Sequence, residues 1–236
     1  MRKYRFPFFV FAAFVFFFYG VLVGKYKIFP YQFIKMVKNK VVTVETSEDR
    51  RNGEERLQMF ELFSPKADVA FIGDSITNGG EWAEFFPQLK VVNRGVSGDK
   101  VSDILVRLDS ILTTQPKKAF IMVGINDINT GIPVDQILIN YERLIGSLLD
   151  AKIKVYVQST IQCALNVCGN AHVKEVKKLN QGLIELTKVE GVFFVDLGSL
   201  SKDTGLEIRF TADGFHLTAK GYLYWVNRIL PYLYSD

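Results

Sequence analysis

The sequence is poor in histidine and cysteine, with two residues of each among its 236. It contains no zinc-type cysteine pattern, no Walker loop and no dinucleotide-binding fingerprint, which argues against zinc-finger, P-loop and Rossmann proteins. The net charge of +4 provides no strongly basic surface for nucleic acid. Because His172 and His216 are the only histidines, the choice of a histidine base is narrow.

The composition is that of a globular protein with an appendage. Hydrophobic residues make up 48% and charged residues 23% of the sequence, close to the average of folded domains. The length suits one well-buried domain and an additional segment. Phenylalanine is distributed unevenly, because eight of the 20 lie between Phe6 and Phe18. The composition of the N-terminal region therefore differs from that of the rest of the sequence.

This region has the pattern of a membrane-spanning segment. Phe8–Val23 contains 16 uncharged residues and is flanked by basic residues on both sides. As a helix it would be about 24 Å long, slightly less than a bilayer core of about 30 Å. A cleaved signal peptide is the alternative, but the end of the segment lacks a good small-x-small cleavage site. We therefore predict an uncleaved anchor at residues 1–24, followed by a juxtamembrane stalk and linker helix at residues 25–62.

The charges that flank the predicted anchor support opposite orientations in the membrane. Basic residues before it favour an exported domain, whereas the lysines after it favour the opposite orientation. Because long domains translocate largely regardless of flanking charge, we expect a single-pass membrane protein with its domain in the periplasm or at the cell surface. There Cys163 and Cys168 could pair across a short loop, whereas in the cytoplasm they would stay thiols. The sequence leaves this pairing open.

Residues 63–236 show short apolar runs alternating with longer amphipathic ones. The predicted strands are Val69–Ile72, Val91–Asn93, Ala119–Val123, Ile153–Gln158 and Val192–Asp196. The predicted helices are Arg50–Phe63, Trp82–Phe86, Val101–Leu112, Val134–Asp150, Val173–Val189 and Thr218–Leu230. Strands separated by such helices indicate βαβ crossovers, so we predict an α/β domain with a five-stranded parallel sheet. A ligand should bind beyond the carboxyl ends of its strands.

Gly73-Asp74-Ser75 is the most informative stretch at that edge. It follows the first predicted strand and reads as a tight glycine turn that presents a serine hydroxyl. A serine hydroxyl is a weak nucleophile at neutral pH and needs a base held by a third group. Asp213 and His216 supply both if the loop between them folds back. Ser75 is therefore the candidate nucleophile, His216 the base and Asp213 the residue that orients the base.

Two further stretches offer donors for an oxyanion. Gly98 ends a glycine-rich run after the second predicted strand, where a positive φ would turn its N–H toward a ligand. Asn126 follows the third predicted strand and carries a side-chain amide donor. Each signal is weak alone, because turn-forming roles explain both residues equally well.

Structural roles explain the neighbouring polar residues. Ser75 alone could be a helix N-cap. Asp74 and Asp127 are predicted to brace turns by hydrogen bonding. His172 follows Asn170, a suitable N-cap, so we predict a surface residue at a helix start and not a base. The stretch from Gln162 to Ala171 is predicted to be a loop at the active-site edge.

Taken together, these motifs resemble the SGNH hydrolases, also called the GDSL lipase/esterase family. The resemblance covers about Val69 to Pro231 and implies a flavodoxin-like three-layer α/β/α sandwich. It implies a triad of Ser75, Asp213 and His216. It also implies an oxyanion hole formed by Ser75, Gly98 and Asn126, and no metal or organic cofactor.

Some stretches are most similar to bacterial carbohydrate esterases, including sialate O-acetylesterase-like members, namely Gly79–Trp82, Asn93–Lys100 and Asp213–Tyr222. The resemblance thus implies a serine esterase that removes acetyl groups from a carbohydrate. The predicted anchor departs from the usual soluble or secreted forms of the family, and with it we predict a membrane-anchored enzyme. Lysophospholipase or thioesterase activity at the membrane and O-acyl transfer to a polysaccharide are the alternative enzyme hypotheses. An anchored scaffold or glycan-binding module is the non-enzymatic alternative.

Overall fold

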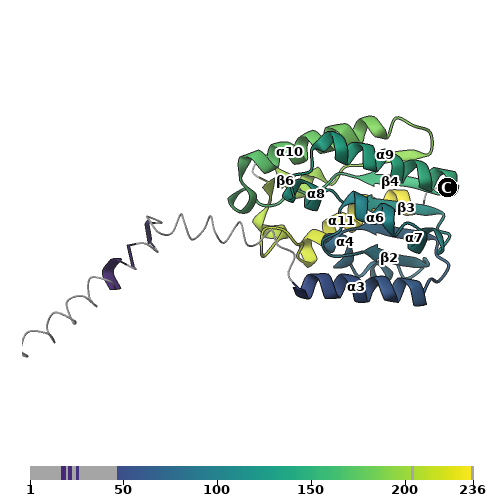
Figure 1. Ribbon diagram of the computed structural model, residues 1–236, viewed down its shortest axis with the longest axis horizontal. Helices are drawn as coiled ribbons and strands as arrows, with labels where there is room; N and C mark the ends of the chain where they lie inside the picture. The colour runs from purple at the N-terminus through teal and green to yellow at the C-terminus, as the bar shows by residue number, and fades with distance from the viewer. Residues whose placement is uncertain (1–16, 20, 23–24, 27–46, 203–204, 235–236) are drawn as a thin grey trace, which may run out of the picture. The chain divides into compact units, whose positions relative to one another are not determined.

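A computed structural model of the protein describes residues 17–19, 21–22, 25–26, 47–202 and 205–234 (Figure 1). The chain divides into two compact units, Met1–Glu45 and Thr46–Asp236. Most of the predicted anchor and of the predicted stalk lies outside the described residues. Among the residues that are described, no helix combines the length and the apolar character needed to cross a bilayer.

Five parallel strands form the central sheet of the second unit. They are β1 (Val69–Gly73), β2 (Val91–Gly95), β3 (Lys118–Met122), β4 (Lys154–Gln158) and β5 (Val192–Val195). Their order is β2-β1-β3-β4-β5, with every neighbouring pair parallel. This order is that of the flavodoxin-like doubly wound fold. The predicted parallel sheet is confirmed, with each strand within two residues of its predicted bounds.

Helices cover both faces of this sheet (Figure 1). They are α3 (Ser47–Leu62), α4 (Ser75–Asn78), α5 (Trp82–Phe85), α6 (Val101–Val106), α7 (Asp109–Leu112), α8 (Ile125–Asn129), α9 (Val134–Asp150), α10 (Leu165–Leu186) and α11 (Ala219–Leu233). Alternate strand residues enter two cores, since Ala70 and Ile72 pack with α6 and α9 while Phe71 packs with α5 and α11. The three-layer α/β sandwich is thus confirmed.

The predicted linker helix is present as α3 and belongs to the second unit. Phe60 on this helix is buried. The Arg56 side chain donates hydrogen bonds to the carbonyls of Gly95 at 2.5 Å and Asn93 at 3.2 Å. These contacts attach α3 to the end of β2.

Two predicted elements differ from the structure. The single helix predicted for Val101–Leu112 is divided into α6 and α7, because the backbone leaves helical geometry at Arg107, whose side chain turns into the fold. The loop predicted for residues 162–171 is helical from Leu165. A kink at Gly169, where φ is +81°, hid the helical periodicity of this stretch.

Short elements complete the fold at the carboxyl end of β5. They are the 3-10 helices η1 (Gly198–Leu200) and η2 (Ile208–Phe210) and the two-stranded ribbon of β6 (Ser201–Lys202) and β7 (Gly205–Leu206). η2 leads into the loop that contains Asp213 and His216.

Candidate active site

Ser75 follows the carboxyl end of β1 and is the first residue of α4. Asp74 caps this helix, because its Oδ1 accepts a hydrogen bond from the Ile76 N–H at 2.9 Å. A Cβ on Gly73 would lie 2.1 Å from the Met122 carbonyl oxygen, so only glycine fits there. Because Asp74 is the N-cap of α4, the alternative of an N-cap role for Ser75 is wrong. The Ser75 hydroxyl makes a different contact.

That contact is with His216, on the loop between η2 and α11. His216 Nε2 lies 3.1 Å from Ser75 Oγ, and His216 Nδ1 lies 2.6 Å from Asp213 Oδ2. The loop folds back as the sequence required, because Asp213 Oδ1 accepts hydrogen bonds from the N–H groups of Phe215 and His216, each at 2.8 Å. Gly214, with φ of +89°, makes this turn possible. The three predicted residues thus form one hydrogen-bonded chain.

The environment of Asp213 keeps it ionised. Partial burial alone would raise the pKa of Asp213, but hydrogen bonds from the His216 ring and from the Phe215 and His216 N–H groups outweigh it and lower that pKa. A carboxylate accepts the Nδ1 proton of His216, which leaves Nε2 with a lone pair toward the Ser75 hydroxyl. His216 is therefore placed to remove the hydroxyl proton. The side chains of His216 and Asp213 are 54% and 53% exposed, so solvent reaches the site.

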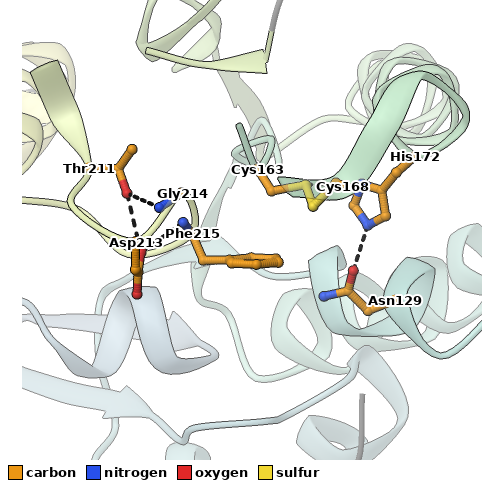
Figure 2. The surroundings of a disulfide bond; sticks show 8 residues. All are labelled: Asn129, Cys163, Cys168, His172, Thr211, Asp213, Gly214 and Phe215. Atoms are coloured by element: carbon orange, nitrogen blue, oxygen red, sulfur yellow. Dashed lines mark hydrogen bonds between the residues drawn. A yellow bond between two sulfur atoms is a disulfide. The ribbon is translucent and has the colours of Figure 1, made fainter. Parts of the chain in front are cut away.

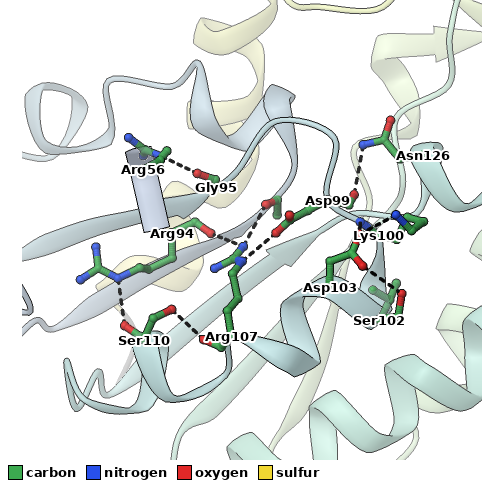
Figure 3. A network of polar contacts seen from close by, with 12 residues as sticks. Arg56, Arg94, Gly95, Asp99, Lys100, Ser102, Asp103, Arg107, Ser110 and Asn126 are labelled. Carbon is green, nitrogen blue, oxygen red and sulfur yellow. Dashed lines mark hydrogen bonds and ion pairs between the residues drawn. The ribbon is translucent and has the colours of Figure 1, made fainter. Parts of the chain in front are cut away.

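The predicted oxyanion donors lie on the loops that follow β2 and β3. Gly98 has the left-handed φ of +83° that glycine tolerates. Asn126 Nδ2 donates to the Asp99 carbonyl at 3.1 Å, which places this amide beside the Asp99–Lys100 peptide, one residue beyond Gly98 (Figure 3). An amide has two hydrogens, so this bond leaves one for a ligand. Ser75 contributes an N–H at a helix start, where no intrahelical acceptor exists.

Arg107 connects the loop after β2 to the ends of β1 and β2, as Figure 3 shows. Its Nε lies 2.7 Å from Asp99 Oδ2, and its Nη2 donates to the carbonyls of Arg94 at 2.9 Å and Gly73 at 3.4 Å. One buried guanidinium thus holds together the ends of β1 and β2 and the loop of Gly98. Sequence reasoning missed Arg107, because its position in an amphipathic helix pattern predicts an exposed charge.

Three buried aspartates surround the candidate residues. Asp127 Oδ2 accepts a hydrogen bond from the Val101 N–H at 3.2 Å, so Asp74 and Asp127 brace turns as predicted. Burial raises the pKa of Asp74 to about 7. Burial also raises the pKa values of Asp99 and Asp127 to about 6, although Arg107 opposes the rise for Asp99. Ionisation of these three carboxyl groups at higher pH therefore lowers the free energy of unfolding.

We expect the substitution Asp74→Asn to flatten the pH dependence of stability between about pH 4 and pH 7. The ordinary pKa of aspartate is 3.8, and in the folded protein that of Asp74 is about 7. The folded state therefore holds a proton that the unfolded state has lost, so this contribution is fully present below pH 3.8 and is lost as the pH rises through about 7. Asparagine also caps helices, so α4 should persist.

Urea unfolding at a series of pH values measures this effect. Asp150→Asn, at an exposed position on α9, is the matched control and should retain the wild-type slope. Equal slopes for Asp74→Asn and wild type would contradict the burial argument.

The two cysteines form a disulfide, Cys163–Cys168, and no free cysteine is left in the chain. This bond lies next to the loop of Asp213, because the Ala164 N–H donates to the Gly214 carbonyl at 2.8 Å. Figure 2 shows the disulfide with Phe215 below it. The cysteine pairing that the sequence left open is thus resolved in favour of a disulfide.

His172 contacts this disulfide and does not contact Ser75. Its Nδ1 lies 3.3 Å from Cys163 Sγ and its Nε2 lies 2.6 Å from Asn129 Oδ1. Burial lowers the pKa of His172. The prediction of a surface position is wrong, because the side chain is half-buried within α10.

An apolar groove of about 540 Å³ borders the candidate site. Leu217, directly after His216, forms part of its wall together with Leu223 and Val226 of α11 and Phe85 of α5. Glu81 is the one charged residue that lines it. The groove therefore suits an apolar group.

A comparison with family models matches residues 71–223 to the GDSL-like Lipase/Acylhydrolase family. The N-acylneuraminate cytidylyltransferase of Streptococcus agalactiae serotype V is 31% identical over 160 residues, which cover 66% of this chain. The match covers 36% of the cytidylyltransferase, so the chain spans about a third of that relative's length.

Two solved structures share the fold. A GDSL-like lipase from Bacteroides thetaiotaomicron superposes with a TM-score of 0.68 at 22% identity, covering 77% of this chain and 97% of that one. A catalytic mutant of an acetylxylan esterase from Geobacillus stearothermophilus superposes with a TM-score of 0.60 at 18% identity, covering 74% and 97%.

Proposed function

The chain belongs to the GDSL-like lipase/acylhydrolase family, and on that premise we propose that it is a membrane-anchored serine esterase that removes acetyl groups from a carbohydrate. As a member of this family it is a hydrolase of carboxylic esters. The observation that carries the proposed mechanism is the chain of hydrogen bonds from Ser75 through His216 to Asp213.

In the proposed reaction, His216 Nε2 removes the hydroxyl proton as Ser75 Oγ attacks the ester carbonyl carbon. Asp213 stabilises the imidazolium that forms. The tetrahedral intermediate expels the alcohol, which takes the proton from His216, and leaves an acyl group on Ser75. Water, deprotonated by His216, then attacks this acyl group and releases the acid.

The N–H groups of Ser75 and Gly98 and the amide of Asn126 stabilise the negative oxygen of each tetrahedral intermediate. The amide of Asn126 is positioned by its bond to the Asp99 carbonyl. Arg107 positions the Gly98 loop through Asp99.

We expect Asn126→Ala to lower kcat for p-nitrophenyl acetate by about 10²–10³-fold, because one oxyanion donor is lost. KM should change little, since the oxyanion exists only in the transition state and the intermediate. Asn227→Ala, at an exposed position on α11, is the matched control and should keep kcat within a few fold. A wild-type kcat for Asn126→Ala would remove this residue from the oxyanion hole.

Three observations favour acetyl esters of a carbohydrate. The similarity of three stretches to carbohydrate esterases supports this substrate class, and a fold neighbour is an acetylxylan esterase. The candidate site is also open to solvent, as a large glycan would require.

The anchor and the location of the domain remain part of the proposal. The uncharged run Phe8–Val23 supports a single-pass anchor. The disulfide Cys163–Cys168 supports an extracytoplasmic domain, because disulfides persist in oxidising compartments.

The apolar groove favours a second candidate function, hydrolysis of lysophospholipids or acyl thioesters at the membrane. Leu217, which lines the groove, directly follows the catalytic histidine in the sequence, so an acyl chain longer than acetyl could extend from Ser75 toward it. Transfer of the acyl group to a polysaccharide is a further alternative and predicts turnover that depends on the acceptor.

Substrate profiling of the full-length chain in detergent separates these functions. The proposed function predicts a steep preference for acetyl over octanoyl p-nitrophenyl esters and release of acetate from acetylated oligosaccharides. The reverse preference, together with cleavage of lysophospholipids, would replace it with the lipid function. Leu223→Ser, an exposed change in the groove, should then lower turnover of octanoyl esters alone.

A further inference from the structure

We propose that Cys163, Cys168 and His172 form a zinc-binding site when the Cys163–Cys168 disulfide is reduced. Among the residues that the structure describes, no other group of three or more histidine, cysteine or acidic side chains brings its ligand atoms within 4.8 Å of one another. The site uses no residue of the proposed triad, and the inference does not depend on the proposed esterase activity.

His172 is held in the orientation of a metal ligand. Its Nε2 lies 2.6 Å from Asn129 Oδ1 (Figure 2). A carbonyl oxygen only accepts hydrogen bonds, so Nε2 carries the proton and Nδ1 of the neutral ring has a free lone pair. That lone pair faces Cys163 Sγ at 3.3 Å. Histidine ligands of metals are generally fixed in this way, through the ring nitrogen that does not bind the metal.

The spacing of the ligand atoms fits a tetrahedral zinc ion. With Zn–N near 2.0–2.1 Å and Zn–S near 2.3 Å, tetrahedral geometry separates N from S by about 3.6 Å and the two sulfurs by about 3.8 Å. The observed distance of 3.3 Å between Nδ1 and Cys163 Sγ is already close to the first value. Reduction frees the sulfurs to reach the second.

The local backbone also allows three ligands from one short stretch. Cys163 lies two residues before the first residue of α10, Cys168 lies in the first turn of this helix, and the kink at Gly169 separates that turn from His172. Cys163 is buried, whereas Cys168 and His172 are half-buried. The ion would therefore bind at the edge of the fold, with its fourth position filled by water. The sequence did not predict this zinc site, because two cysteines and one histidine provide only three ligands and structural zinc sites usually have four.

An external thiol converts the disulfide form of Cys163 and Cys168 into the reduced form that binds zinc. One thiolate attacks the disulfide and a second thiol resolves the mixed disulfide, so two external thiols become a disulfide while Cys163 and Cys168 each gain a proton. Zinc then displaces both protons and binds two thiolates and one neutral imidazole. The reverse exchange with an external disulfide re-forms the Cys163–Cys168 bond, returns two external thiols and releases the ion.

Zinc titration of the full-length protein before and after reduction tests the proposal. The protein is reduced with a phosphine, freed of reductant without oxygen, and titrated with Zn²⁺ in a calorimeter. We expect one zinc per reduced chain and none per oxidised chain. Co²⁺ in place of Zn²⁺ should give thiolate-to-cobalt charge-transfer absorption and the intense visible bands of tetrahedral coordination.

Matched variants assign the ligands. His172→Ala and Cys168→Ser should each weaken zinc binding at least about 10-fold, and Asn129→Ala by about 10–100-fold. Asn170→Ala, an exposed change on the same helix, should bind zinc like the wild type.

Absence of stoichiometric zinc binding by the reduced wild type, or undiminished binding by His172→Ala, would overturn the proposal. Circular dichroism follows the fold of each sample. If the reduced chain loses its fold, restoration by zinc supports the site, because binding is then coupled to folding. Failure of zinc to restore it counts against the site.

Discussion

Replacement of Ser75 by alanine should lower kcat/KM for p-nitrophenyl acetate by about 10⁵-fold. The hydroxyl 3.1 Å from His216 Nε2 is the only group in this hydrogen-bonded chain that can act as a nucleophile. Without it, His216 can at best activate water, and the oxyanion donors alone retain a small part of the acceleration. The loss corresponds to about 7 kcal/mol of transition-state stabilisation.

The fold of the Ser75→Ala variant should not change, because alanine is a good helix former and the cap of α4 is Asp74. Near-UV circular dichroism and the unfolding midpoint check this. Ser102→Ala, on α6, is the matched control and should retain at least about half of the wild-type activity. Activity of Ser75→Ala near the wild-type level would eliminate the proposed mechanism.

The next largest effect is expected for Asp213→Asn, with a loss of about 10⁴-fold in kcat. An asparagine can keep the bonds from the Phe215 and His216 N–H groups through its carbonyl oxygen. Its amide nitrogen would then face His216 Nδ1 as a donor. The ring would respond by carrying its proton on Nε2, where it can no longer accept the proton of Ser75.

Nitrogen NMR of labelled histidine tests this explanation directly. The chain has only two histidines, so His216→Gln assigns both sets of signals. The wild type should show His216 protonated on Nδ1, and Asp213→Asn should show it protonated on Nε2, while His172 is unchanged in both. A loss of activity without a change of tautomer would attribute the role of Asp213 to something other than orientation of the ring.

The sequence predicted the sheet well, because its strands are short, fully buried apolar runs. Phe71 and Ile72 of β1 and Phe120 and Ile121 of β3 are 0% exposed, and such runs stand out between turn residues. Hydrophobic periodicity predicted the wrong helix bounds where tertiary contacts control the backbone. Arg107 ends α6 because its guanidinium binds Asp99, and no local pattern contains that contact.

The candidate site was predictable to the extent that its residues follow strand ends. Parallel strands bring their carboxyl ends to one edge, which places Ser75, Gly98 and Asn126 near one another in any such fold. The sequence left the disulfide open, because the pairing depends on the redox state of the compartment. The position of His172 was not predictable, because His172 lies just beyond the kink at Gly169. The burial of Asp74 was not predictable either, because it depends on the side chains that pack around Asp74 in the folded protein.

Labelling with a fluorophosphonate tests whether Ser75 is the activated nucleophile of this protein. This reagent reacts with serines activated by a neighbouring base, and mass spectrometry of the digested full-length protein locates the adduct. We expect one phosphonylated residue, Ser75, with labelling abolished in His216→Gln and retained in Ser102→Ala. An intact, folded protein that leaves Ser75 unlabelled, or that carries the adduct on another serine, would contradict it.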